Sequence, residues 1–279
     1  MSEAIGAARQ NEPVRSAGPL GGLGRFVAET AYLGLRAWRR FYRVPANPLS
    51  IVLYPLIQLF VFSQLFKDIV QLPGFGASSG SYLAYLAPGQ ITFTVFFAVS
   101  WSGGNLLYDY RSGMLDKLRA TPVGRYAILA GELVPLFLEC MIMAAAILVL
   151  SLLLGARIET GLPGAVGVLL LAGAFGVAWA GTSFVPALLT KNEQATGTLS
   201  ILFFPIAFMS TAFVPVALMP DWLQVINAWN PITYVIEAMR ALMVSGFEWD
   251  AIGRAVVAIA AVGLVLHSIT LLAFRRLTD

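Results

Sequence analysis

Long apolar runs, separated by short polar segments, dominate the pattern along this chain of 279 residues. Six runs are free or nearly free of charge, and they cover residues 49–66, 82–107, 126–154, 165–189, 199–219 and 251–274. A helix needs roughly 20 mostly apolar residues to cross about 30 Å of hydrocarbon, and each run is close to that length or longer. The pattern therefore predicts an all-α polytopic membrane protein with six transmembrane helices.

The composition agrees, since 58% of the residues are hydrophobic and only 12% are charged, against about 25% charged in soluble domains. Fourteen of the 18 Lys and Arg residues lie before the first run, between the second and third, between the fourth and fifth, or after the sixth. Basic residues concentrate on the cytoplasmic side of membrane proteins, so both termini are expected in the cytoplasm. The net charge of +3 lies beside the predicted spans, where it favours contact with anionic lipid and not with nucleic acid.

The region before the first run divides into two parts. Residues 1–24 are polar and rich in Gly, Ala and Arg, which predicts a flexible cytoplasmic tail. Residues 25–44 are too charged to span, but in a helix their basic and apolar side chains separate into two sectors: Arg36, Arg39, Arg40 and Arg43 opposite Val27, Ala31, Leu35, Trp38 and Tyr42. We expect an interfacial amphipathic helix that lies along the inner membrane surface. It serves as an anchor, or also as a docking surface for a cytoplasmic partner, and residues 45–279 form the six-span domain.

A second irregular region, 220–249, follows the fifth run on the outer side. It is apolar but interrupted by Asn230 and Pro231, and Asn at a cap followed by Pro at the first helical position is a helix start. Two short helices are predicted, and 14 residues reach only about 21 Å, so the pair should enter the membrane from outside and return. Glu237 and Arg240 are three residues apart and can pair, as a structural ion pair or, alternatively, as a substrate contact.

Two acidic residues lie inside the third run. Glu132 and Glu139 are seven residues apart and share a helix face, which is compatible with a proton relay or a cation site. The alternative is that each carboxyl is neutral or hydrogen-bonded to a neighbouring helix. The single cysteine, Cys140, excludes an internal disulfide and a Cys-rich metal site.

Motifs for catalysis are missing. A phosphate-binding P-loop needs Gly-Lys followed by Ser or Thr, but Phe, Asp and Thr precede the three lysines, which are Lys67, Lys117 and Lys191. No HExxH pattern occurs either, because the chain has a single histidine. The chain is therefore expected to be a non-catalytic subunit with no cofactor or metal of its own, and a partner or an ion gradient must supply energy.

Two motifs carry a resemblance to a known family. The charged segment 108–125 between the second and third runs contains G-x-L-x-x-L-x-A-T-P, and residues 220–240 read P-x-W-L, then N-P-I-T-Y, then E-A-x-R. With these motifs the chain, from about Arg25 to its C-terminus, resembles the type-2 permeases of ABC exporters. It is most similar to the branch of daunorubicin-type drug-resistance exporters, and more distantly similar to exporters of polysaccharide and lipopolysaccharide.

The resemblance implies a permease that dimerises, as a homo- or heterodimer, in a bacterial inner membrane. Two copies of a separate P-loop ATPase, which binds ATP and Mg, would dock on a coupling helix formed by Gly113, Leu115, Leu118, Arg119, Thr121 and Pro122. The outer motif would comprise Asn230, Pro231, Glu237 and Arg240. The expected function is export of amphipathic drugs or lipids. The alternatives are export of lipid-linked polysaccharide in the same fold, and ion-coupled transport through Glu132 and Glu139.

Overall fold

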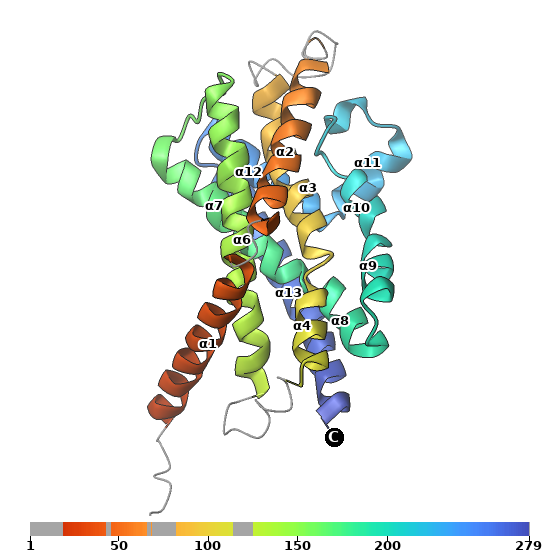
Figure 1. Ribbon diagram of the computed structural model, residues 1–279. Helices are drawn as coiled ribbons and strands as arrows, with labels where there is room; N and C mark the ends of the chain where they lie inside the picture. Colours follow the sequence, from red (N-terminus) through yellow and green to blue (C-terminus); the bar gives the residue numbers. More distant parts are fainter. Residues whose placement is uncertain (1–18, 43–45, 66–67, 69–81, 114–124, 279) are drawn as a thin grey trace, which may run out of the picture.

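The computed structural model describes residues 19–42, 46–65, 68, 82–113 and 125–278, and these residues form helices and turns without any strand. Figure 1 shows the bundle that they build. Its elements are α1 (Pro19–Tyr42), α2 (Ala46–Leu65), α3 (Tyr82–Val99), α4 (Gly103–Arg111), α6 (Arg125–Leu153), α7 (Gly161–Trp179), α8 (Gly181–Thr190), α9 (Glu193–Ile201), α10 (Phe204–Phe208), a 3₁₀ turn η4 (Val216–Leu218), α11 (Asp221–Ala228), α12 (Pro231–Arg240), a π-helical turn η5 (Ala241–Ser245) and α13 (Trp249–Thr278).

Four segments in the described part of the chain are long and apolar enough to cross a membrane: Tyr82–Asp109, Ala127–Leu153, Gly161–Thr190 and Trp249–Arg275. They coincide with the second, third, fourth and sixth apolar runs. The first run falls on α2, whose described apolar part, Pro55–Leu65, is shorter than a span. An all-helical membrane protein is thus confirmed, and the total of six spans stays a prediction.

The fifth apolar run, 199–219, does not form the single continuous helix that its length predicts. α9 ends at Ile201, α10 covers only Phe204–Phe208, and residues 209–215 form turns and bends before η4. Pro205 lies in the first turn of α10 and Pro215 caps η4, where a missing N–H and a fixed φ favour new helix starts.

Two spanning segments contain a break, and a serine side chain stabilises one of the two breaks. The segment 82–109 is interrupted between α3 and α4, and the segment 161–190 at Ala180. Ser183 accepts a hydrogen bond from the backbone N–H of Gly103 (2.8 Å) and donates one to the carbonyl of Ser100 (2.9 Å). Backbone groups freed inside a membrane need such partners, so Ser183 stabilises the break between α3 and α4.

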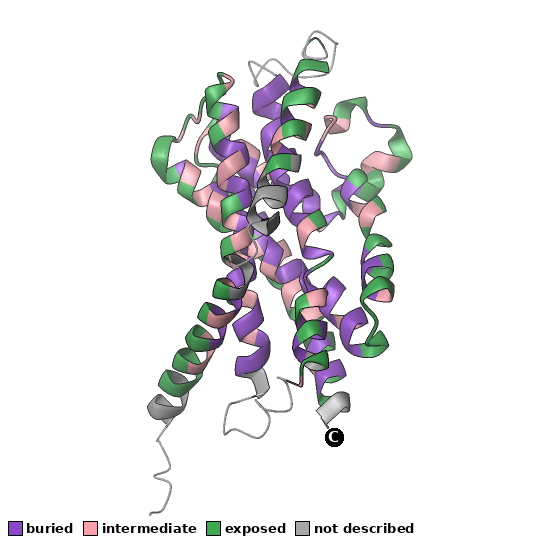
Figure 2. Ribbon diagram, in the orientation of Figure 1, coloured by how far each residue is buried: buried purple, intermediate pink, exposed green. Residues whose placement is uncertain are grey.

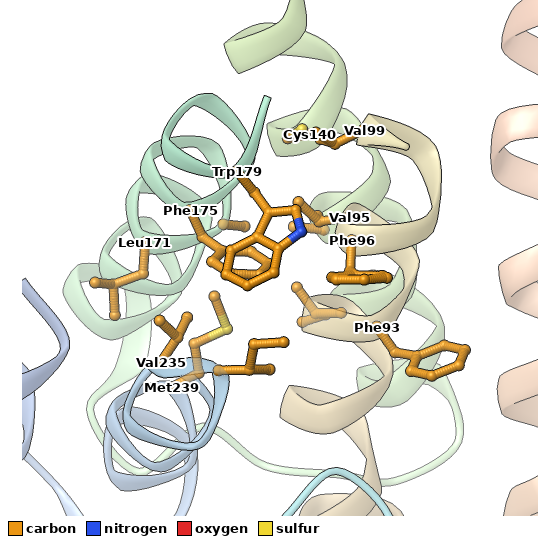
Figure 3. Close-up of a cluster of buried hydrophobic side chains, with 14 of the residues drawn as sticks. Phe93, Val95, Phe96, Val99, Cys140, Leu171, Phe175, Trp179, Val235 and Met239 are labelled. Carbon is orange, nitrogen blue, oxygen red and sulfur yellow. The ribbon is translucent and has the colours of Figure 1, made fainter. Parts of the chain in front are cut away.

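The core lies where α3, α6, α7 and α12 meet. Figure 3 shows Phe96 and Trp179 facing each other there, with Phe175, Cys140 and Met239 around them. Three small residues of α7 and its end, Ala172, Gly176 and Ala180, are buried in this core, and a side chain at Gly176 would collide with Cys140. Figure 2 shows buried residues along these helices.

α1 begins at Pro19, so residues 19–24 of the predicted tail are helical, whereas 1–18 lie outside the described residues. The helix packs on α6 through Leu33, which lies against Gly131, while Val27 and Leu35 are exposed. Figure 1 shows α1 leaving the bundle obliquely near the end where the C-terminus lies. Its orientation in a membrane stays a prediction.

The outer region forms the two predicted short helices, α11 and α12, and the second of them ends at Arg240 instead of near 244 because η5 continues it as a π-helical turn. Asn230 caps α12 by accepting from the N–H of Ile232 (3.0 Å), and Pro231 occupies the first helical position. α12 belongs to the core of the bundle, since Ile232, Ile236 and Met239 are almost fully buried.

Candidate functional site

A cluster of charges joins three helices near one end of the bundle. Arg36 of α1 forms a salt bridge from Nη2 to Oδ2 of Asp109 in α4, and the same nitrogen lies 3.9 Å from Oε1 of Glu132 in α6. Both carboxylates belong to buried residues, whereas the side chain of Arg36 is 31% exposed. A buried carboxylate is costly unless it is paired, so one guanidinium offsets the charge of two acids here.

In this cluster Arg36 contacts two other helices of the bundle, whereas the sequence pattern placed it with the other arginines in a sector opposite the apolar face. α1 approaches α6 closely because glycines meet side chains on both helices: Gly131 lies against Leu33, and Gly34 against Val134. The close approach brings Arg36 over the start of α6 and within reach of Asp109. Of the other arginines in the predicted basic sector, Arg39 is exposed, while the side chains of Arg40 and Arg43 lie outside the described residues.

The two acids of the third span have different environments. Glu132 is ion-paired with Arg36, whereas Glu139 lies two turns further along α6 and is half-buried. In the described part of the chain, no three His, Cys, Asp or Glu side chains gather where they could hold a metal ion. The arrangement fits structural pairing of Glu132 better than a two-carboxylate cation site.

The end of α4 also contacts the turn between α8 and α9. Arg111 donates from Nη2 to the carbonyl of Lys191 (3.4 Å), and its Nη1 lies 4.0 Å from Oε2 of Glu193. Both side chains are more than half exposed, so this contact contributes little stability by itself. Together with the salt bridge of Asp109, it connects α4 to both sides of the bundle.

The predicted coupling helix follows directly after these contacts. Gly113, the last described residue of this stretch, has a left-handed φ of 65° that ends the turn after α4. The described chain resumes at Arg125, where α6 begins. The other predicted coupling residues lie outside the described residues: Leu115, Leu118, Arg119, Thr121 and Pro122. Figure 1 shows the end of α4, the start of α6, the α8–α9 turn and the C-terminus at one end of the bundle, with α11 toward the other.

At that other end, the outer motif holds the broken fifth segment. Asn230 donates from Nδ2 to the carbonyl of Ile206 (2.7 Å) while it caps α12. Arg240 donates from Nη2 to the carbonyl of Thr211 (2.7 Å), and its guanidinium carbon lies 3.8 Å from the ring centre of Tyr85. Among the described residues, the salt bridges of 4.0 Å or less do not include Glu237 with Arg240, so the expected ion pair is replaced by contacts to backbone and ring.

The sequence patterns did not single out three residues of these sites, which are Asp109, Asn227 and Tyr85. Asp109 lies in the charged segment after the second run, where an acidic residue is normally solvent-exposed. Only the structure shows that it pairs with Arg36. Asn227 donates to the carbonyl of Met209 (2.9 Å) and Tyr85 to that of Thr211 (3.1 Å). A polar residue in an apolar helix was the available signal for Asn227.

Comparison with known proteins places the chain in a family. Residues 28–244 match the model of the family described as ABC-2 type transporter. The chain belongs to this family. It is 33% identical, over 86% of its length and 84% of the relative's, to the daunorubicin resistance ABC transporter permease protein DrrB1 of Streptomyces coeruleorubidus.

Two further relatives are less similar to the chain. A putative transport permease, ycf38, of Cyanophora paradoxa is 30% identical over 78% of the chain and 74% of the relative. The probable doxorubicin resistance ABC transporter permease protein DrrC of Mycobacterium tuberculosis is 23% identical over 84% of the chain and 83% of the relative. Membership makes the chain a multi-pass membrane subunit of an ABC transporter, a class that is normally non-catalytic, forms permease dimers and works with an ATPase partner.

Proposed function

We propose that the chain is the permease subunit of an ATP-driven exporter that moves amphipathic drugs out of the cytoplasm or inner leaflet, or lipids by the same route. The names of the relatives in Streptomyces and Mycobacterium support a drug as cargo. The observation that carries the proposal is the salt bridge between Arg36 and Asp109, because it ties the helix that leads into the coupling segment to α1 and, through Glu132, to α6.

In this mechanism the ATPase performs the chemistry and the permease receives its motion. Two ATPase subunits, each with ATP and Mg, seat the segment that begins at Gly113, with Leu115 and Leu118 as apolar anchors and Arg119 at the rim. Thr121 and Pro122 belong to the same proposed coupling segment, before α6. Motion of the segment reaches α4 directly. It then reaches α1 and α6 through the charge cluster, since a paired buried charge resists separation from its partner.

The proposal includes a topology. Six spans within residues 45–279 lie in a bacterial inner membrane with both termini in the cytoplasm, α1 lies at the inner surface, and α11 with α12 dips in from outside. The second permease chain completes the pathway as a homo- or heterodimer. The end of α4, the start of α6 and the α8–α9 turn lie at one end of the bundle, and α11 lies toward the other. This arrangement is compatible with one cytoplasmic end and one outer end.

The two alternatives have less support. Export of lipid-linked polysaccharide uses the same fold and the same ATPase, and only the cargo distinguishes it. Ion-coupled transport would use Glu132 and Glu139, but the carboxylate of Glu132 is already within salt-bridge distance of Arg36 (3.9 Å).

Purification without cross-linker tests the function. We expect a P-loop ATPase to co-purify with the permease, the isolated permease to hydrolyse no nucleotide, and the reconstituted complex to move daunorubicin across vesicles only with ATP and Mg. Transport by the permease alone under a proton gradient, without ATPase, would instead establish the ion-coupled carrier.

A further inference from the structure

The broken fifth segment exposes a problem that a continuous helix would not have. Residues 209–215 are non-helical between α10 and η4, yet Ser210, Thr211 and Ala212 are buried. Backbone carbonyls at a helix end have lost their helical partners, and inside a membrane protein water is scarce. The carbonyls of Ile206, Met209 and Thr211 therefore need other donors.

Side chains of α11 and α12, including the cap residue of α12, supply these donors. Asn227 near the end of α11, Asn230 at the start of α12 and Arg240 at its end donate to the carbonyls of Met209, Ile206 and Thr211, at 2.9, 2.7 and 2.7 Å. Asn227 and Asn230 are buried, at 2% and 4% exposure. We call these three side chains the carbonyl clamp. Since each carbonyl has its own donor, the clamp determines the path of the chain through the break.

The clamp also places an aromatic layer. Phe204, Phe208 and Phe213 flank the clamped carbonyls, and their rings meet the ring of Phe93 in α3 at centroid distances of 5.3, 5.1 and 5.3 Å. On the same side a side chain at Gly89 of α3 would collide with the backbone of Ala212. The break is thus held by hydrogen bonds on one side and packs tightly on α3 on the other.

We propose that Asn227, Asn230 and Arg240 are positioning residues for export. They hold the broken fifth segment against α3, and their three hydrogen bonds to its carbonyls stay formed throughout the transport cycle. The inference rests on the proposed function. A closed clamp is expected because opening it would remove the side-chain donors of Ile206 and Met209 in a buried, poorly hydrated place, and would leave the carbonyl of Thr211 with Tyr85 as its side-chain donor. α11, α12 and the break then behave as one body, and transport depends on its geometry.

Asn230 allows a selective test, because its two hydrogen bonds use different atoms. Asn230→Asp keeps the oxygen that caps Ile232 but replaces the amide that donates to Ile206 with a second acceptor. We expect transport per purified, ATPase-bound complex to fall at least tenfold, with ATPase co-purification unchanged. The matched control is Asn192→Asp, since Asn192 caps α9 through the N–H of Ala195 (3.1 Å) and is exposed. This control should transport like the wild type.

A covalent tie tests whether the clamp stays closed. In a Cys140→Ala background, Asn227→Cys removes the amide that donates to the carbonyl of Met209, and Met209→Cys adds a second thiol for oxidation to a disulfide by copper phenanthroline and dioxygen. We expect the oxidised protein to transport within about threefold of the background variant, and the reduced protein to transport at least fivefold more slowly. Each single-cysteine variant should not respond to oxidation.

Three results would overturn the inference. Wild-type transport per complex by Asn230→Asp would show that the amide serves folding alone. Transport by the reduced but not the oxidised double-cysteine protein would show that the clamp must open. Equal loss in Asn192→Asp would show that the effect is not specific to the break. Failure of the proposed function itself looks different, since the wild-type complex would then lack either the ATPase or ATP-dependent transport.

Discussion

Arg36 in α1 and Asp109 in α4 form a salt bridge across 73 residues of sequence, immediately before the segment that is predicted to couple the permease to its ATPase. Glu132 of α6 lies within 3.9 Å of the same guanidinium. Arg36 therefore connects the N-terminal helix, the end of the second span and the start of the third.

Asp109→Asn is expected to weaken this connection. The variant keeps the shape but removes the charge that pairs with Arg36, so the free energy of unfolding should fall by about 1 to 3 kcal/mol and ATP-driven transport should fall with it. Thermal unfolding of the purified complex and vesicle transport measure the two effects. The exchanged pair Arg36→Asp with Asp109→Arg should recover part of the transport.

Asp250→Asn, which breaks an exposed salt bridge with Arg254 (2.9 Å), is the control and should cost less than about 1 kcal/mol. Equal losses in Asp109→Asn and Asp250→Asn would show that the cluster has no special role.

Leu118→Asp tests the coupling segment. If Leu118 is an apolar anchor in a groove of the ATPase, an unpaired carboxylate there should lower occupancy by orders of magnitude. The protein should be inserted and dimerise normally but lose both transport and co-purification of the ATPase, whereas Arg119→Ala at the rim should cost far less. The reverse ranking, with Arg119→Ala inactive and Leu118→Asp active, would identify an electrostatic tether.

Glu139→Gln distinguishes ATP-driven from proton-coupled transport. The substitution preserves shape and hydrogen bonding and removes the titratable group, so transport should stay within a few-fold of wild type if Glu139 is structural. Transport assays at matched expression provide the measurement. Complete loss with normal expression would support the ion-coupled carrier.

Two helical glycines differ in the space around them and give a matched stability test. A side chain at Gly176 in α7 would meet Cys140 and Val95, so Gly176→Ala should destabilise the protein by about 1 to 3 kcal/mol. Gly253 in α13 has no neighbour within 4 Å, so Gly253→Ala should stabilise by about 0.5 to 1 kcal/mol. Adding Cys140→Ala to Gly176→Ala should restore part of the loss. Thermal unfolding in detergent measures the series, and equal shifts for the two glycines would contradict the packing.

The predicted topology places the loop 74–81 outside the cell. A cysteine at Ser79, in a Cys140→Ala background, should react with a membrane-impermeant thiol reagent in intact cells. Labelling only after lysis would reverse the orientation that the distribution of Lys and Arg predicts.

Much of the fold was determined by the sequence alone, because the length and polarity of a spanning helix are local properties. Four apolar runs coincide with helices that can span, and the two short helices around Asn230 and Pro231 follow from cap chemistry that acts over a few residues. The coupling and outer motifs were likewise visible in the sequence, because they are short strings, and the family that they indicated is the one whose model matches residues 28–244.

Only the tertiary structure decided which polar side chains meet. A helical pattern placed Arg36 with the other arginines opposite the apolar face, but a close approach of α1 and α6 at Gly34 and Gly131 brings it to Asp109. The length of the fifth run predicted one continuous helix, but the chain breaks there. Asn230 and Arg240, from later in the chain, stabilise the break by donating to its carbonyls. Pairing depends on which residues folding brings together, and no local pattern records the partner.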